Sequence, residues 1–347
     1  MTISITVILK EVQPMNNPAV TLTGLNNRNR SRAKHPFRVI MEKEMSDHLG
    51  GWRFIILTAI IALTCLGSLY TALSNMGQAV KPNDPEGSFF FLKLFTISDG
   101  TMPSFMVFIS FLGPLLGIGL GFDAINSEHN RGTLSRILSQ PIHRDYLINA
   151  KFVAALAVIS AMLIVLGLTV MGAGLVSLGI PPTAEEFVRM IFFILLSIIY
   201  VAFWLNLSIL FSVLFRQPAT AALSAIAVWL FFTVFYPLIV NMILKPMEPS
   251  AAASPYHMVA FEQLRLTLMR VMPNQLFSEA TTTLLMPSVR SLGPLTMEQM
   301  IGTVPGPLPL GQSLLLVWPQ VTGLIAGTII SFVISYILFM RREIRPR

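Results

Sequence analysis

The sequence is poor in charged residues and contains a single cysteine. Only 12% of its 347 residues are Asp, Glu, Lys or Arg, whereas soluble domains carry about 25%. Hydrophobic residues make up 54% of the chain, and the mean hydropathy is +0.69. This composition excludes an ordinary soluble domain and indicates a membrane protein. Because Cys65 is the only cysteine, no intrachain disulfide can hold the loops together.

The sequence also lacks the motifs of several enzyme classes. It contains no HExxH zinc motif, no GxSxG nucleophile elbow and no GxxxxGK[ST] phosphate-binding loop. All five histidines lie outside the apolar stretches, so a zinc site inside the membrane would have no imidazole ligands. We therefore predict that the chain is not itself an enzyme and that it binds no ATP, cofactor or metal of its own.

Long apolar runs are what the sequence has instead. A transmembrane helix needs about 20 mainly apolar residues, and six stretches qualify. They lie at about residues 54–74, 104–122, 152–179, 190–214, 219–243 and 313–340. Their middles contain no ionisable side chain, which argues against an ion-coupled carrier, because such carriers place ionisable groups inside the membrane. We predict an all-α membrane protein with six transmembrane helices.

The distribution of basic residues predicts the orientation. With six spans both termini lie on one side, which would carry 17 of the 24 Lys and Arg residues against seven on the other. The side rich in Lys and Arg is cytoplasmic, so we expect both termini in the cytoplasm. The net charge of +7 then suits insertion into the lipid bilayer and needs no nucleic acid. Residues 1–35 are predicted to form a flexible N-terminal tail.

An amphipathic helix is predicted just before the first span. In PFRVIMEKEMSDHLGGW the apolar side chains fall on one helical face and most charged ones fall elsewhere. The residues of that face are Phe37, Ile40, Met41, Met45, His48 and Leu49. This pattern is typical of a helix lying in the membrane interface. A plain membrane anchor without a role in transport explains it equally well.

The segment between spans two and three, residues 123–151, predicts a short cytoplasmic helix, which we call the elbow. Thr133 can cap this helix and Pro141 ends it. Its apolar stripe is Leu134, Ile137 and Leu138, edged by Glu128, Arg131, Arg136 and Gln140. Asp145 can cap the third span, with Arg144 and Lys151 at the lipid head groups. Such a stripe suits a groove on a soluble partner, whereas a solvated loop would not need it.

Span two carries three glycines at four-residue spacing, Gly113, Gly117 and Gly121, with Pro114 beside them. Small residues at this spacing let helix backbones approach closely, and proline permits a kink. Packing within the bundle and a bendable, force-transmitting helix explain the motif equally well. Asn206 and Pro237 are further candidates for the transport pathway or for packing.

The elbow resembles the signature of ABC-2 type transporter permeases. That signature is S-E-x-x-x-G-T-L, followed by L-S-x-P-[I/V]-x-R and a lysine at the start of the next span. Its residues here are Ser127, Glu128, Gly132, Thr133, Leu134, Leu138, Ser139, Pro141, Ile142, Arg144 and Lys151. The Lys43-Glu44 pair before span one and the C-terminal Arg341-Arg342-Glu343 also agree. The resemblance therefore covers nearly the whole chain from about residue 36 and implies that residues 36–347 form an ABC-2 type transmembrane domain.

The resemblance implies a permease subunit of an ATP-binding cassette exporter in a prokaryotic plasma membrane. The elbow would be the coupling helix, seated on a separate P-loop ATPase subunit that binds ATP and Mg²⁺. The connecting helix would carry Phe37, Ile40, Met41, Glu44 and Met45. Spans two and five would line the path in a dimer with a second permease copy or a paralogue. A membrane scaffold that couples an ATPase to the regulation or assembly of another complex is the alternative function.

The loop between spans five and six, about residues 245–312, is long and rich in proline. MVAFEQLRLTLMR and NQLFSEATTTLLM predict two amphipathic helices in it, separated by Pro273 and with Asn274 as a cap. Members of the family often carry short outer helices at this place. We expect an outer helical lid, with a site for an external protein partner as the alternative.

Overall fold

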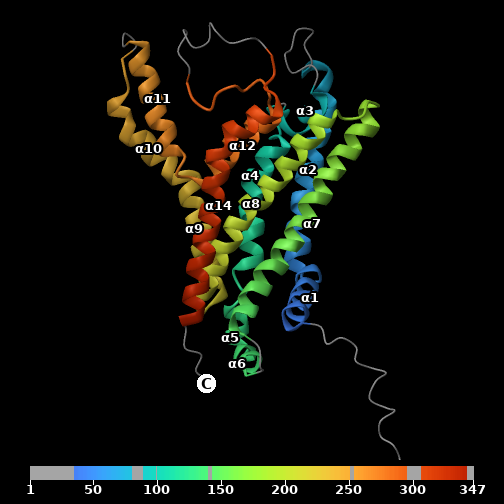
Figure 1. The fold of residues 1–347 in the computed structure, drawn as a ribbon, viewed down its shortest axis with the longest axis vertical. Helices are drawn as coiled ribbons and strands as arrows, with labels where there is room; N and C mark the ends of the chain where they lie inside the picture. Colours follow the sequence, from blue (N-terminus) through green and yellow to red (C-terminus); the bar gives the residue numbers. More distant parts are fainter. Residues whose placement is uncertain are drawn as a thin grey trace, which may run out of the picture. The chain divides into compact units, whose positions relative to one another are not determined.

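The computed structural model describes residues 35–79, 89–98, 100–139, 143–250, 254–294 and 306–341. All regular elements in these segments are helices (Figure 1). Pro36–Arg347 forms one compact unit. The tail predicted for residues 1–35 lies outside the described residues, except for His35.

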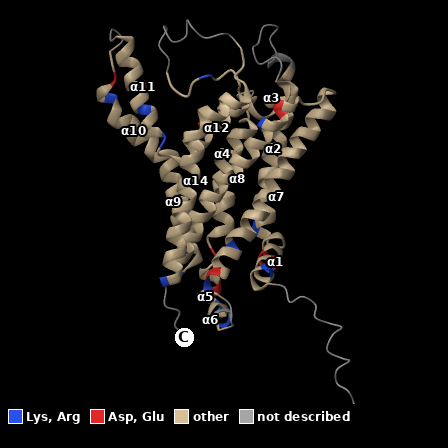
Figure 2. Ribbon diagram, in the orientation of Figure 1, with Lys and Arg blue, Asp and Glu red and all other residues tan. Residues whose placement is uncertain are grey.

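Six helical segments are long and apolar enough to cross a membrane, which confirms the predicted all-α class and number of spans. They are α2 (Trp52–Ala79), α4 (Phe105–Gly121), α7 (Arg144–Leu178), α8 (Ala184–Leu214), α9 (Pro218–Leu230) and α14 (Leu310–Arg341). The fifth span continues from α9 through a π-helical turn at Phe231–Phe235 into α10 (Tyr236–Leu244). The middles of these spans carry no Lys, Arg, Asp or Glu among the described residues (Figure 2).

Short helices gather at the two ends of the bundle. At one end are α1 (Pro36–Leu49), α5 (Asn126–Asn130) and α6 (Thr133–Leu138), together with the C-terminal end of α14 (Figure 1). At the other end, which we call the outer end, are α3 (Phe90–Thr96), α11 (Pro255–Met269) and α12 (Pro273–Leu285). A short 3₁₀ turn, η2 (Lys245–Met247), follows α10. The helix before span one and the elbow therefore share an end, as a six-span topology requires.

Helix α8 is the centre of the packing. In the 18-residue apolar stretch of α8, 56% of the residues are buried within the chain. The corresponding share is 22% in α2 and in α14 and 17% in the fifth span. Its main neighbours are α4 and α14. Phe193, Tyr200 and Trp204 of α8 are fully buried in the hydrophobic core. The fifth span, in contrast, presents most of its apolar side chains outward.

The glycine motif of α4 lies against α8. A Cβ atom at Gly117 would come within 2.8 Å of the Val201 carbonyl oxygen, and one at Gly121 within 2.9 Å of the Leu205 carbonyl oxygen. A Cβ atom at Gly113 would meet the Val201 side chain at 3.0 Å. These approaches leave no room for a side chain, so the glycines serve close packing of the two backbones. Pro114 is buried in the same helix.

The two predicted outer helices are present as α11 and α12, but Asn274 does not cap the second. The N-cap position is Met272, and Pro273 takes the first helical turn, where its missing N–H costs nothing. Helix α12 packs into the main core, where the Phe277 ring stacks on Tyr200 with 4.3 Å between centroids. Helix α11 instead shares a small separate cluster with α10.

Candidate functional site

The elbow is built as two short helices instead of the single helix predicted. Gly132 separates α5 from α6 and has a φ of +69°, a left-handed conformation that glycine adopts without steric cost. Thr133 is the first residue of α6, so it does not cap the helix as predicted. Its hydroxyl donates to the Glu128 carboxylate and to the Glu128 carbonyl oxygen. These hydrogen bonds connect the first residue of α6 to Glu128 of α5.

The elbow is fastened to the end of α8. The Ser212 hydroxyl accepts hydrogen bonds from the backbone N–H groups of Ile125 at 2.9 Å and of Asn126 at 3.2 Å. The Asn130 side-chain amide donates to the Arg216 carbonyl oxygen at 3.0 Å, just beyond α8. The elbow is therefore held by polar bonds to another span as well as by its covalent links to α4 and α7.

The structure corrects the role predicted for Leu134. Its side chain is only 3% exposed and belongs to the main hydrophobic core, so it is not an exposed anchor for a partner. Helical periodicity identifies residues that share a face, but here that face turns toward the chain's own interior at Leu134. Gln140 and Pro141, and the side chains of Ile137 and Leu138, lie outside the described residues. Three arginines of this region, Arg131, Arg136 and Arg144, are exposed.

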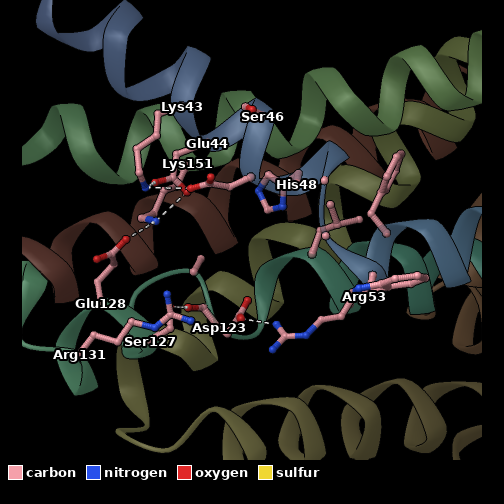
Figure 3. Close-up of a pocket in the computed structure, with 18 residues that line it drawn as sticks. Lys43, Glu44, Ser46, His48, Arg53, Asp123, Ser127, Glu128, Arg131 and Lys151 are labelled. Atoms are coloured by element: carbon pink, nitrogen blue, oxygen red, sulfur yellow. Dashed lines mark hydrogen bonds and ion pairs between the residues drawn. The ribbon is translucent and has the colours of Figure 1, made fainter.

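Lys151 is also placed differently from the prediction. Its side chain is 5% exposed instead of lying at the lipid head groups, and its ammonium contacts two carboxylates. The Nζ atom is 2.8 Å from Oε2 of Glu44 and 3.4 Å from Oε1 of Glu128. These partners come from α1 and α5, and their carboxylates approach the ammonium from two sides (Figure 3). Asp145 does not cap α7 either, because the N-cap position is His143.

Each of the two carboxylates has a second donor. The Lys43 Nζ atom lies 3.2 Å from Oε1 of Glu44, and the Thr133 hydroxyl bonds to the remaining oxygen of Glu128. The side chains of Glu44 and Glu128 are only 9% and 14% exposed. Buried carboxylates require such partners, because burial of an unpaired charge is costly. We call Lys151, Glu44 and Glu128 the Lys151 hub.

Helix α1 lies along α7 at this end of the molecule. The Phe37 ring meets Tyr146 of α7 edge to face, with 6.2 Å between centroids. Ile40 packs against the main core, and Met41 and Met45 are half-buried. The predicted apolar face of α1 is therefore used largely for packing on the chain itself.

A polar cavity of about 610 Å³ opens between α1, the start of α2, the end of α4, the elbow and α7 (Figure 3). Arg53 at the start of α2 pairs with Asp123 after α4, and its guanidinium lies over the Phe122 ring at 4.9 Å. His48 of α1 also lines the cavity. Burial holds the pKa of His48 below its usual value, although the Glu44 carboxylate acts in the opposite direction. The cavity therefore has paired charges of both signs on its walls.

The two remaining candidates lie in the spans. The Asn206 side-chain amide of α8 donates to the Thr328 carbonyl oxygen of α14 at 3.3 Å. This bond joins two helices, which is the usual use of asparagine between membrane helices. Pro237 is half-buried in the first turn of α10, directly after the π-helical turn. Its ring cannot supply a backbone N–H, which is consistent with the irregular helix at this point.

Residues 38–344 match the family described as ABC-2 family transporter protein. The chain belongs to this family. Two similar relatives are the probable ABC transporter permease proteins NosY of Pseudomonas aeruginosa and of Stutzerimonas stutzeri. Each is 27% identical to this ABC-2 family member. The similarity covers 59% of the present chain, 70% of the Pseudomonas aeruginosa protein and 69% of the Stutzerimonas stutzeri protein. The protein is thus a multi-pass ABC transporter permease, the membrane part of such a transporter.

Proposed function

We propose that this permease is the membrane half of an ABC exporter in a prokaryotic plasma membrane, driven by a separate P-loop ATPase. The sequence has no phosphate-binding loop of its own. The observation that carries the proposal is the elbow, a short helical knob at the end of the bundle, hydrogen-bonded to α8 and to the residue Arg216 beyond it and bearing exposed arginines. A knob that is rigidly attached to the spans is suited to receive force from a partner.

The proposed orientation places the elbow and both termini in the cytoplasm. The count of basic residues on the two sides supports this orientation. ATP and Mg²⁺ would bind between ATPase subunits, and closure of these subunits would displace the elbows of two permease copies. Because each elbow is continuous with α4 and α7 and bonded to α8, its displacement would shift these spans and change the side to which a central path opens.

The exposed arginines of the elbow provide the test. We expect the chain alone in nanodiscs to hydrolyse no ATP above background, and hydrolysis to appear only with its cognate P-loop ATPase subunit. The double variant Arg131→Glu with Arg136→Glu should weaken binding of that ATPase by about tenfold or more, because interface arginines often contribute more than 1 kcal/mol each. Both side chains are exposed, so the variant should still fold.

Arg265→Glu is the matched control, since Arg265 is half-exposed on α11 at the outer end. It should leave ATPase binding unchanged. Biolayer interferometry on nanodisc-embedded permease would measure the affinity, and phosphate release would measure hydrolysis. If the elbow variant bound the ATPase as tightly as the control, the elbow would not be the docking element. Robust hydrolysis by the pure chain would overturn the whole proposal.

A further inference from the structure

Three segments that are distant in the sequence meet at the Lys151 ammonium. Glu44 precedes Lys151 by 107 residues and Glu128 precedes it by 23. Glu44 belongs to α1, Glu128 to the elbow and Lys151 to the beginning of the third span. Figure 3 shows both carboxylates pointing at the ammonium from opposite sides. The hub thus joins the two peripheral helical elements at this end of the bundle through one buried cation.

The chemistry of the hub makes this junction specific. An ammonium has three donors and no acceptor, and here it serves two carboxylates whose other oxygens are held by Lys43 and Thr133. If the elbow moved and α1 did not, the partly buried Glu128 carboxylate would lose Lys151, its cation. The unpaired charge would be unfavourable at a site where the three side chains are 5%, 9% and 14% exposed. Joint movement of α1 and the elbow keeps both pairs intact.

We propose that Lys151 is a positioning residue that makes α1 and the elbow move as one unit when the ATPase displaces the elbow. This inference rests on the proposed function for the origin of the force, but the junction itself belongs to the chain alone. Without the hub, α1 would be held by its packing on α7 and would have no direct bond to the elbow through Lys151, so the distance between α1 and the elbow would no longer be fixed. The hub therefore extends the action of the ATPase from the coupling element to the helix that precedes span one.

A distance measurement on the chain alone tests the junction. Spin labels at Ser46 of α1 and Ser139 of the elbow, both exposed, would be introduced after Cys65→Ala removes the only native cysteine. In nanodiscs we expect one narrow distance distribution by double electron–electron resonance. Lys151→Met should broaden and shift it, because the Glu128 carboxylate then loses its ammonium partner and Glu44 keeps only Lys43 of its own helix. Lys151→Arg, which keeps the charge, should restore a narrow distribution.

A second variant separates the junction from a failure to fold. Lys151→Met combined with Glu44→Gln and Glu128→Gln removes the buried charges together, so no unpaired carboxylate remains. This triple variant should fold, and its distance distribution should again be broader than that of the parent protein. A distribution as narrow as the parent's in the triple variant would show that packing alone fixes α1 to the elbow, and the inference would be wrong.

The complex with the ATPase tests the joint movement. Between the nucleotide-free state and the state trapped with ATP and orthovanadate, the distance should stay constant in the parent protein and change in the triple variant. Both proteins should bind the ATPase equally, because no exposed elbow arginine is altered. If the parent distance changed between the two states, α1 and the elbow would not form one unit. Absence of ATPase binding by the parent would instead contradict the proposed function and leave the result on the isolated chain standing.

Discussion

Arg189 offers the sharpest test of how the outer end is held together. Its side chain is 0% exposed, and its guanidinium donates to the carbonyl oxygens of Leu284 at 3.0 Å and Leu308 at 2.6 Å. It also reaches the Ser313 hydroxyl at 3.2 Å and the Glu185 carboxylate at 2.8 Å. A single side chain of α8 thereby joins the last turn of α12, the segment before α14 and the first turn of α14.

Arg189→Met removes the charge and the donors but keeps a long apolar side chain. Two backbone carbonyls would lose a donor, and each buried acceptor without a partner costs about 1–3 kcal/mol. Glu185 is 38% exposed, so water can replace its cation at smaller cost. We expect a total loss of about 3–5 kcal/mol, the range found when one partner of a buried ion pair is removed. The apparent Tm should then fall by on the order of 5–10 °C.

Thermal unfolding in detergent, followed by tryptophan fluorescence, would measure the loss, and hydrogen exchange would locate it. Exchange should increase in the last turn of α12 and in the first turn of α14. Arg265→Met on α11 is the matched control, because that arginine is half-exposed and, among the residues that the structure describes, forms an ion pair with its neighbour Glu262, so its effect should stay within about 0.5 kcal/mol. Arg189→Lys should be intermediate, since lysine keeps the charge but not the planar fork. If Arg189→Met melted like the control with unchanged exchange in α12, the reasoning would be refuted.

Two further predictions concern packing and orientation. Gly117→Ala should destabilise the protein by about 1–3 kcal/mol, because its Cβ atom would lie 2.8 Å and 2.9 Å from backbone atoms of α8. Gly172→Ala is the control, since a Cβ atom there would have nothing within 4 Å. In the same melting assay it should be neutral or slightly stabilising. In a Cys65→Ala background, Tyr256→Cys on α11 should react with an impermeant maleimide in intact cells and Arg131→Cys only after permeabilisation; the reverse pattern would invert the proposed orientation.

The six spans could be predicted from the sequence because crossing a membrane depends on the length and apolarity of a continuous stretch. The same local information located α1, the elbow and the two outer helices. These elements are set by residues close together in the chain. The predicted boundaries differ from those of the structure mainly where a span continues beyond the apolar run. The third span, for example, begins at Arg144 instead of near residue 152.

The Lys151 hub could not be predicted from periodicity, because it depends on contacts between residues far apart in the sequence. One local signal was available. Glu44 lies four residues after Ile40 and four before His48, so it falls on the apolar face of α1. A carboxylate on a face that packs against other helices needs a cation, and Lys151 immediately precedes an apolar stretch. The orientation of Leu134 had no comparable signal, because an exposed stripe and a buried stripe have the same spacing.

Arg189 directly precedes the predicted fourth span, about residues 190–214, a position from which arginine side chains commonly extend to the interface. It is buried instead because Leu284 and Leu308, from either side of the loop between α12 and α14, supply carbonyl groups above it. The sequence of α8 contains nothing that predicts these two carbonyl groups beside Arg189. Glu279 of α12 is satisfied in a similar way, by Arg270, Gln275 and Gln320. The outer end thus owes its order to polar contacts that form only in the folded chain.

Helix α8 connects the two ends of this arrangement. It spans 31 residues, or about 46 Å at 1.5 Å per residue. Ser212, near one end, holds the elbow, and Arg189, near the other, holds α12 and α14. Between these points α8 is packed against the glycine face of α4 without room for a side chain. If the Ser212 bonds hold, an elbow displacement that moves α8 along its axis must either carry α12 with it or break the bonds of Arg189. Ser212 and Arg189 therefore anchor neighbouring elements at opposite ends of one helix.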